Sequence, residues 1–132
     1  MQFETFDFND AGFKVLMHYD TWRVAILNFV DDCKLDGLRY VEAHLETDEV
    51  FVLLEGEATL VFADIKNDVI TQINAVKLEK NKVYNIKKGI YHTQLLSTDA
   101  KLLIVEAKDT GDSNSIKHYL STNDLKLIKE AL

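Results

Sequence analysis

Two short stretches of the chain carry residue types that could share one divalent metal ion. The first contains Glu42, His44 and Glu49, and the second contains His92. Imidazole nitrogens and carboxylate oxygens suit Mn, Fe, Co, Ni or Zn, and they are poor ligands for soft ions. We therefore treat these four residues as the candidate metal ligands.

The spacing of the first stretch fits two neighbouring strands. On a strand, residues i and i+2 face the same way, so Glu42 and His44 share a face. Residues 45–48 read as a four-residue turn, and Glu49 then begins an apolar segment. Antiparallel neighbours lie about 5 Å apart, so Glu49 can return alongside His44. Gly56 follows where a tight turn requires positive φ.

The residues alone leave the roles of these side chains open. Glu42 could be a ligand, a free carboxylate with its pKa raised in a cavity, or an edge residue that points to solvent. His44 and His92 bind metal only as neutral imidazoles, and a strand histidine can equally be a hydrogen-bonded structural residue. As a free carboxylate in a cavity, Glu42 is a candidate catalytic acid or base.

Strand parity adds three candidates for a substrate pocket. Tyr40 shares a face with Glu42, Phe51 shares one with Glu49, and Gln94 shares one with His92. Tyr40 and Phe51 could instead be ordinary core residues. Gln94 is also a catalytic candidate, because a buried amide needs hydrogen-bond partners.

The rest of the chain reads as many short strands separated by Gly, Asn and Asp, which predicts an antiparallel sandwich or barrel. The run from Val50 to Leu54 is continuously apolar, as expected for a strand buried on both faces. The predicted strands cover residues 22–29, 38–45, 50–54, 58–65, 69–78, 83–86, 91–96 and 101–108.

The C-terminal residues have a different pattern. Residues 110–115 read as a loop, and Ser121 to Asp124 resembles a capping box. Leu125, Ile128 and Leu132 follow at helical spacing, which predicts a short helix packed on the outside. We expect one domain over residues 1–132, with a core at about 20–108 and a loop and helix at about 109–132.

The spacing of the candidate ligands resembles the cupin superfamily. His44, four residues, Glu49, six residues and Gly56 match most of the first cupin motif, and Gly89, two residues and His92 match part of the second. The chain departs from the pattern at Glu42, where the first motif histidine would stand. It departs again at Lys87 in place of a proline and at Leu96 in place of the last asparagine.

The resemblance implies an all-β fold: a small jelly-roll barrel, also called a double-stranded β-helix and RmlC-like. It implies a divalent metal inside the barrel, unless the change at Glu42 has abolished the site. The implied activities include isomerases, dioxygenases and lyases that act on a small polar metabolite such as a sugar or organic acid. The alternative is a metal-free ligand-binding or sensor module without catalysis.

Charge and composition limit the classes of molecule that this chain is expected to bind. A net charge of −7 argues against a nucleic-acid surface, and no apolar stretch is long enough to span a membrane. The N-terminus lacks signal-peptide features, and the lone Cys33 excludes an intrachain disulfide, so we expect a reducing cytoplasm. We also expect a homodimer, because open sandwiches must protect their edges, with Phe3, Phe6 and Phe8 packing across its interface.

Overall fold

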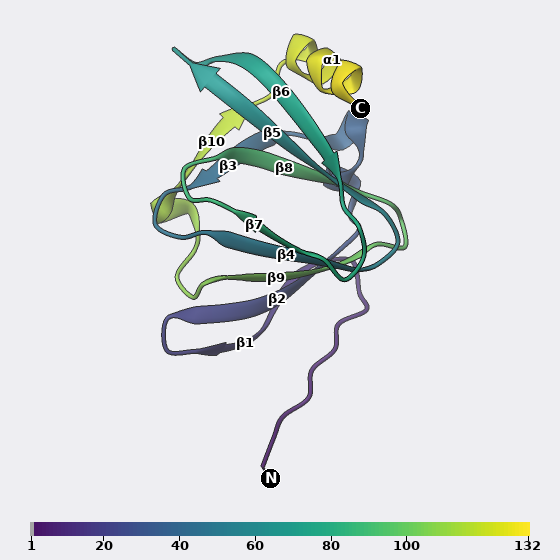
Figure 1. Cartoon of the computed structure of the whole chain (residues 1–132), viewed down its shortest axis with the longest axis vertical. Helices are drawn as coiled ribbons and strands as arrows, with labels where there is room; N and C mark the ends of the chain where they lie inside the picture. Colours follow the sequence, from purple (N-terminus) through teal and green to yellow (C-terminus); the bar gives the residue numbers. More distant parts are fainter. Residues whose placement is uncertain (1) are drawn as a thin grey trace.

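The computed structural model describes residues 2–132, and its regular structure is mainly β-strand, with one short C-terminal helix (Figure 1). The described residues form ten strands: β1 (Gly12–Tyr19), β2 (Trp22–Asn28), β3 (Tyr40–His44), β4 (Glu49–Glu55), β5 (Ala58–Lys66), β6 (Val69–Lys77), β7 (Val83–Ile86), β8 (Tyr91–Leu96), β9 (Lys101–Ala107) and β10 (Ser115–Tyr119).

The strands form two antiparallel sheets of five. Sheet A has the order β1-β2-β9-β4-β7, and sheet B has the order β10-β3-β8-β5-β6. In both sheets, strands that are distant in sequence lie side by side, as in a jelly roll. The predicted jelly-roll fold is therefore confirmed.

The main core lies between the two sheets. Alternate residues of each strand point inward, so Phe51 and Leu53 of β4 face Leu60 of β5, and Leu102 of β9 fills the same layer. Each of these four side chains is almost fully buried. Burying a side chain of this size contributes about 1.5–3 kcal/mol, so this layer supplies much of the stability.

The C-terminal helix α1 (Thr122–Ala131) covers the outer face of sheet B. Ser121 accepts a hydrogen bond from the Asp124 backbone N–H, and Asp124 accepts one in return from the Ser121 backbone N–H. Ile128 of this helix is completely buried and packs in one cluster with Val61 of β5. The predicted capping box and the predicted outside position of the helix are confirmed.

Two strands lie outside the range of 20–108 that we expected for the core. β1 pairs with β2 at one edge of sheet A, and β10 pairs with β3 at one edge of sheet B. Both strands mix polar and apolar residues, and all of their side chains are half-buried or exposed. Neither segment therefore carries a strong apolar run. Short 3-10 turns, η1 (Asp31–Cys33), η2 (Leu35–Gly37) and η3 (Asp112–Asn114), connect the sheets.

The apolar run in β4 is not buried on both faces within this chain. Phe51 and Leu53 face the core, whereas Val50 and Val52 on the opposite face are only half-buried. No helix among residues 2–132 is long and apolar enough to cross a membrane.

Candidate metal centre

Three of the four candidate ligands converge between the sheets. His44 ends β3 and His92 lies near the start of β8, both in sheet B, while Glu49 begins β4 in sheet A. One donor atom from each lies within 4.8 Å of the others, and all three side chains are buried. The two sheets therefore bring the motif residues to one point in the interior.

The donor atoms lie near the separations that a shared ion requires, although the contact between Glu49 and His92 is shorter than that of two coordinated ligands. Glu49 Oε1 lies 2.8 Å from His92 Nε2 and 3.3 Å from His44 Nε2. Ligands held about 2.1 Å from one ion, at angles of about 90–110°, are separated by about 3.0–3.4 Å. Two imidazoles and one carboxylate also form a donor set that proteins use for iron and related divalent ions.

The other ring nitrogens are hydrogen-bonded, which fixes how the imidazoles point. His92 Nδ1 lies 3.0 Å from the Ile90 carbonyl oxygen, and His44 Nδ1 lies 2.8 Å from Ser115 Oγ. A carbonyl only accepts, so His92 Nδ1 carries a proton. His92 Nε2 faces Glu49 Oε1 at hydrogen-bond distance, and a bound ion would take the place of that hydrogen bond. Such partners orient metal-binding histidines in known sites. Ser115 reaches His44 because β10 pairs with β3 in this register.

The charges at the centre favour an ionised carboxylate. Burial raises the pKa of Glu49, but its hydrogen bonds with His44, His92 and Glu106 outweigh burial and hold that pKa well below its usual value. Burial lowers the pKa of His44, but the hydrogen bond and charge of Glu49, with the charges of Glu42 and Glu106, raise it overall.

Behind Glu49 lies a second buried carboxyl group that the sequence reasoning missed. Burial raises the pKa of Glu106 to about 7, the hydrogen bond and charge of Glu49 act in the same direction, and Arg23 opposes both. Arg23 Nη2 lies 2.6 Å from Glu106 Oε2, and the guanidinium also donates to the carbonyls of Lys108 and Thr110. Glu106 could have been found by parity, because it shares the inward face of β9 with Leu102 and Ile104.

The centre opens into a cavity of about 390 Å³. Tyr40, Phe51 and Gln94, the predicted pocket residues, all lie on its wall. Glu42 lines it too, opposite His92 on β8 and Lys117 on β10. The Glu42 carboxylate is not among the three donor atoms that converge, so the structure separates Glu42 from the other candidate ligands.

Three cationic side chains line the same cavity. Arg23 is fully engaged by Glu106 and two carbonyls. Lys117 Nζ lies 3.2 Å from the exposed carboxylate of Asp112 and 4.6 Å from the centre of the Tyr40 ring. Arg39 is exposed, and its guanidinium makes no hydrogen bond or ion pair with residues 2–132. Arg39 and Lys117 therefore present positive charge that a ligand could meet.

Cys33 also borders the cavity, but its thiol is buried among core residues. Burial raises the pKa of Cys33, and the charge of Asp32 adds to that increase. A thiol of this kind is inert as a nucleophile, because the reactive form is the thiolate.

Comparison with solved structures identifies the architecture. A scan against protein-family models found no match, and a search of curated proteins found none either. The fold is similar to a cupin-2 domain protein from Shewanella frigidimarina, with 22% identity, 76% of this chain and 85% of that chain covered, and a TM-score of 0.57. It is similar to an RmlC-like cupin from Methanocaldococcus jannaschii, with 11% identity, 81% and 92% covered, and a TM-score of 0.57.

A third similar structure is the Streptomyces protein Pac13 with uridine, at 9% identity, with 89% of this chain and 87% of that chain covered and a TM-score of 0.57. Identities this low describe the fold and not the activity. The strand order, the two sheets and these three structures agree, and the chain has the double-stranded β-helix fold of the cupins.

Proposed function

We propose that this chain is a metal-dependent cupin that acts on a small polar metabolite in its interior cavity. The observation that carries the proposal is the convergence of His44 Nε2, His92 Nε2 and Glu49 Oε1, with the opposite ring nitrogens already hydrogen-bonded. A divalent ion held by these atoms would polarise a substrate oxygen or activate water or dioxygen.

The chain's own residues would position the centre and the substrate. Ser115 and the Ile90 carbonyl orient the two imidazoles, and Glu106 holds Glu49 from behind. Glu42 faces the cavity outside the converging group, which favours its role as a free acid or base over its role as a fourth ligand. Gln94 can donate and accept hydrogen bonds from the same wall.

Five carboxyl groups and three cations line the cavity, and among the cations Arg39 is the one that favours an anionic metabolite, such as a sugar acid or another organic acid. The Arg39 guanidinium makes no hydrogen bond or ion pair within residues 2–132, and a guanidinium recognises a carboxylate by two parallel hydrogen bonds. Lys117 stands opposite Glu42, two residues along the strand from the position opposite His44, or about 7 Å. A six-carbon acid could therefore reach both the cationic wall and the metal centre. One similar structure, Pac13, is described as a nucleoside dehydratase, so this fold does accommodate a metabolite of comparable or larger size.

Metal analysis of the purified protein tests the first part. We expect about one equivalent of a first-row metal per chain after purification with added metal. The double variant His44→Ala/His92→Ala should retain none while its far-UV circular dichroism stays unchanged. His18→Ala/His118→Ala is the matched control, because it removes two histidines outside the cavity, and its metal content should equal that of the wild type.

Two results would contradict the proposal. Unchanged metal content in the His44→Ala/His92→Ala variant would show that the ion binds at another site. No metal in the wild type, even after supplementation, would favour the metal-free ligand-binding module. The substrate class is tested separately by thermal shift, with sugar acids compared against the corresponding neutral sugars. We expect the acids alone to raise the melting temperature, and Arg39→Gln to reduce that shift.

A further inference from the structure

The two walls of the interior cavity differ in polarity. The residues that sheet B contributes to the wall all have polar side chains, and beyond the ligands His44 and His92 they include Tyr40, Glu42, Gln94 and Lys117. Beyond Glu49, the part of the wall that comes from sheet A contains the apolar side chains of Phe13, Leu27, Phe51 and Ile104. The cavity therefore has a polar side and an apolar side.

The other charged residues of sheet A do not alter this division, because they lie at the metal end and bind one another. Arg23 on β2 pairs with Glu106 on β9, and its Nη2 lies 2.6 Å from the Glu106 carboxylate. Glu106 is in turn hydrogen-bonded to Glu49. Beyond these residues, sheet A presents hydrocarbon to a ligand.

The strand register places both walls next to the metal centre. On sheet A, Phe51 follows Glu49 by two residues on the same face, and Ile104 lies directly opposite Phe51 on β9. On sheet B, Gln94 follows His92 by two residues on the same face. Two residues along a strand span about 7 Å. A ligand that reaches the centre therefore has Phe51 and Ile104 on one side and Gln94 on the other.

The polar side has hydrogen-bonding groups that the protein leaves free. The side chains of Glu42 and Gln94 make no hydrogen bond to any residue from 2 to 132, and their polar atoms are not closed off as Asn28 Oδ1 is. Lys117 pairs with the exposed carboxylate of Asp112 at 3.2 Å, and an ion pair of this kind is weak. The polar groups of a ligand can thus find partners on sheet B, but not on the apolar residues of sheet A.

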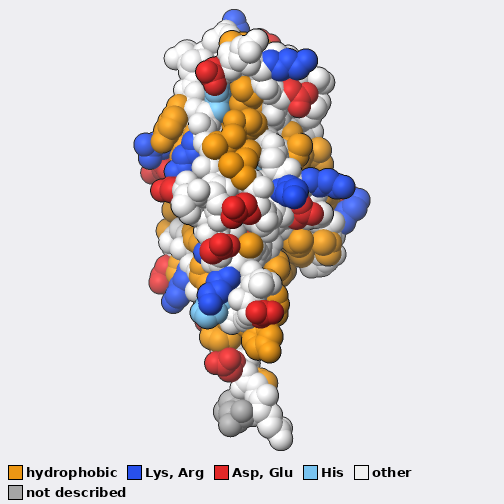
Figure 2. Space-filling view, turned by 90° about the vertical axis from the view of Figure 1, so that its left-hand side faces the viewer, with side chains coloured by type: hydrophobic (Ala, Val, Ile, Leu, Met, Phe, Trp, Pro, Cys, Tyr) orange, Lys and Arg blue, Asp and Glu red, His pale blue; other side chains and the backbone are white. Residues whose placement is uncertain are grey.

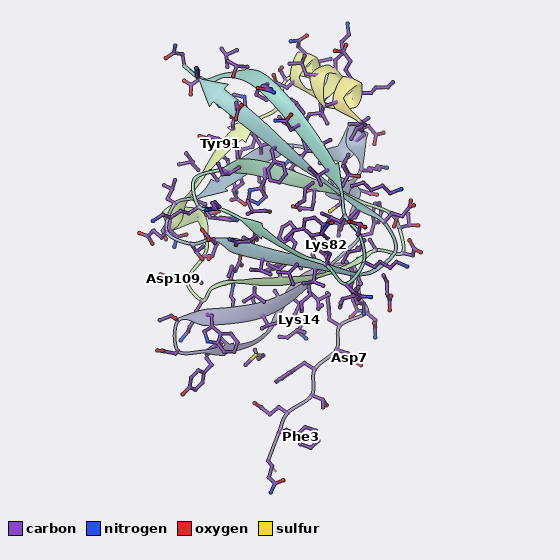
Figure 3. All side chains as sticks on the ribbon, in the orientation of Figure 1. Phe3, Asp7, Lys14, Lys82, Tyr91 and Asp109 are labelled. Carbon is purple, nitrogen blue, oxygen red and sulfur yellow. The ribbon has the colours of Figure 1, made fainter. Side chains whose placement is uncertain are left out.

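Figure 3 marks the end of the molecule at which this division begins. Tyr91 comes one residue before His92, and Asp109 comes three residues after Glu106, and both labels stand on the same side of the view. Figure 2 faces that side, and acidic, basic and hydrophobic side chains are intermingled on its surface. Because no single charge dominates this surface, discrimination between acids depends on the cavity walls.

A cavity with two unlike sides accepts some organic acids better than others. A sugar acid carries hydroxyl groups all around its ring, so some of them would meet Phe51 and Ile104 and lose their hydrogen bonds to water without replacement. An acid with an apolar body places carbon against carbon on that side and can direct its polar groups towards sheet B. An aromatic body would also gain from edge-to-face contact with the Phe51 ring.

We propose that the ligand of this cavity is an organic acid with an apolar body, of the kind represented by a hydroxybenzoate, rather than a polyhydroxylated sugar acid. The inference rests on the function proposed above and narrows its substrate class. The apolar body lies against Phe51 and Ile104, and the hydroxyl group reaches Gln94. The carboxylate meets Arg39, the cation on the wall that has no other bond within residues 2–132.

Calorimetric titration of the protein, purified with added metal, tests the proposal with ligands matched in charge and ring size. The three monohydroxybenzoates and glucuronate each carry one carboxylate on a six-membered ring, but glucuronate also carries hydroxyl groups around that ring. The tightest hydroxybenzoate should bind at least about tenfold more tightly than glucuronate, a difference of about 1.4 kcal/mol.

Substitutions on the apolar wall test which side of the cavity is responsible. Phe13 is 47% exposed, so the fold should tolerate Phe13→Gln, and this change should weaken hydroxybenzoate binding about threefold without affecting glucuronate. Phe6→Gln is the matched control, because Phe6 is also 47% exposed and does not line the cavity. Ile104→Thr places a hydroxyl on the buried part of the wall and should reduce the preference for hydroxybenzoate over glucuronate.

Glucuronate that binds as tightly as the best hydroxybenzoate would overturn the inference. So would the absence of hydroxybenzoate binding at millimolar concentration, or a preference that neither Phe13→Gln nor Ile104→Thr changes. None of these results bears on the metal, because the metal content of the His44→Ala/His92→Ala variant decides that part of the proposed function. A preference for hydroxybenzoate in a protein that holds no metal would support this inference and contradict the metal-dependent function.

Discussion

Glu49 and Glu106 are two carboxyl groups in one buried site, and their surroundings move their pKa values in opposite directions. The histidines hold the pKa of Glu49 low, while burial and the neighbouring Glu49 raise the pKa of Glu106 to about 7. At neutral pH, one group is fully ionised and the other retains much of its proton. Arg23 holds Glu106 in place in either state.

The raised pKa of Glu106 predicts how the stability of the metal-free protein depends on pH. The pKa of Glu106 rises from its usual value of 4.5 to about 7 in the folded chain. Between these two pH values the folded chain therefore binds the proton more tightly than the unfolded chain does. Stability should therefore fall as pH rises from 5 to 7.5, by up to about 3 kcal/mol. Glu106→Gln should lack this component, because an amide does not titrate.

Urea denaturation of both proteins at several pH values measures the difference. His44 is present in both, so its own titration largely cancels. Parallel stability curves for the wild type and Glu106→Gln would show that Glu106 is ionised throughout this range.

Matched Glu→Gln substitutions at Glu49 and Glu42 test which of the two carboxylates is a metal ligand. Glu49→Gln should lose metal at least a hundredfold more readily than the wild type, because the ionised carboxylate supplies one of three donors. Glu42→Gln should keep its metal, since that carboxylate lies outside the converging group. Titration with a competing chelator measures both affinities. Equal losses in the two variants would make Glu42 a fourth ligand.

At the scale of elements, the turns that deliver the ligands depend on particular backbone conformations. Gly56 closes the turn after β4 with φ of 72°, and Gly89 has φ of 83° three residues before His92. A Cβ on Gly56 would lie 2.7 Å from the backbone of Ala100, whereas one on Gly89 would meet nothing within 4 Å.

Replacing each glycine with alanine should therefore give unequal costs. Gly89→Ala should lower the free energy of unfolding by about 1–2 kcal/mol, the cost of a left-handed backbone alone. Gly56→Ala should cost about 2 kcal/mol more, because the backbone of Ala100 must move as well. Urea denaturation with tryptophan fluorescence compares the two. Similar losses would mean that the 97–100 turn shifts freely.

The helix cap gives a smaller and more local prediction. Ser121→Ala removes the hydroxyl that accepts from the Asp124 N–H and should destabilise α1 by about 1 kcal/mol. Ser113→Ala, at an exposed position without a side-chain hydrogen bond, should change nothing measurable. Thermal unfolding of the two variants provides the comparison, and a cap without effect would indicate that packing of Ile128 alone holds the helix.

These elements also show what the sequence can and cannot predict. The eight strands from β2 to β9 and the helix carry clear patterns, because burial imposes alternation on strands and a cap marks the helix start. The spacing around His44, Glu49 and Gly56 likewise predicted which residues meet. β1 and β10 were missed because both mix polar and apolar residues, and none of their side chains is fully buried.

Local sequence patterns could not predict which strands that are distant in sequence pair with each other. Ser115 reaches His44 only through the pairing of β10 with β3, and Glu106 meets Glu49 only across β9 and β4. A single charged residue on the inward face of β9 was the available signal. Glu42 was harder, since parity placed it correctly on the inner face but could not say how far its carboxylate stands from the other donors.

For the whole molecule, metal binding should appear as added stability. An ion that binds only the folded chain contributes about 2.7 kcal/mol at a hundred times its dissociation constant. The melting temperature of the wild type should therefore rise by about 10 °C with metal and return with a chelator. The His44→Ala/His92→Ala variant is the control and should show no shift. A rise in that variant would indicate a second, unrelated site.

The donor atoms of the candidate metal centre come from both sheets, with two on sheet B and one on sheet A. An ion held by these atoms would link the two sheets across the core. Amide hydrogens of β3, β8 and β4 should then exchange slowly and together when metal is bound. After a chelator removes the ion, the amides of the two sheets should exchange independently. Substrate entry and local opening of the fold would thus depend on the same metal site.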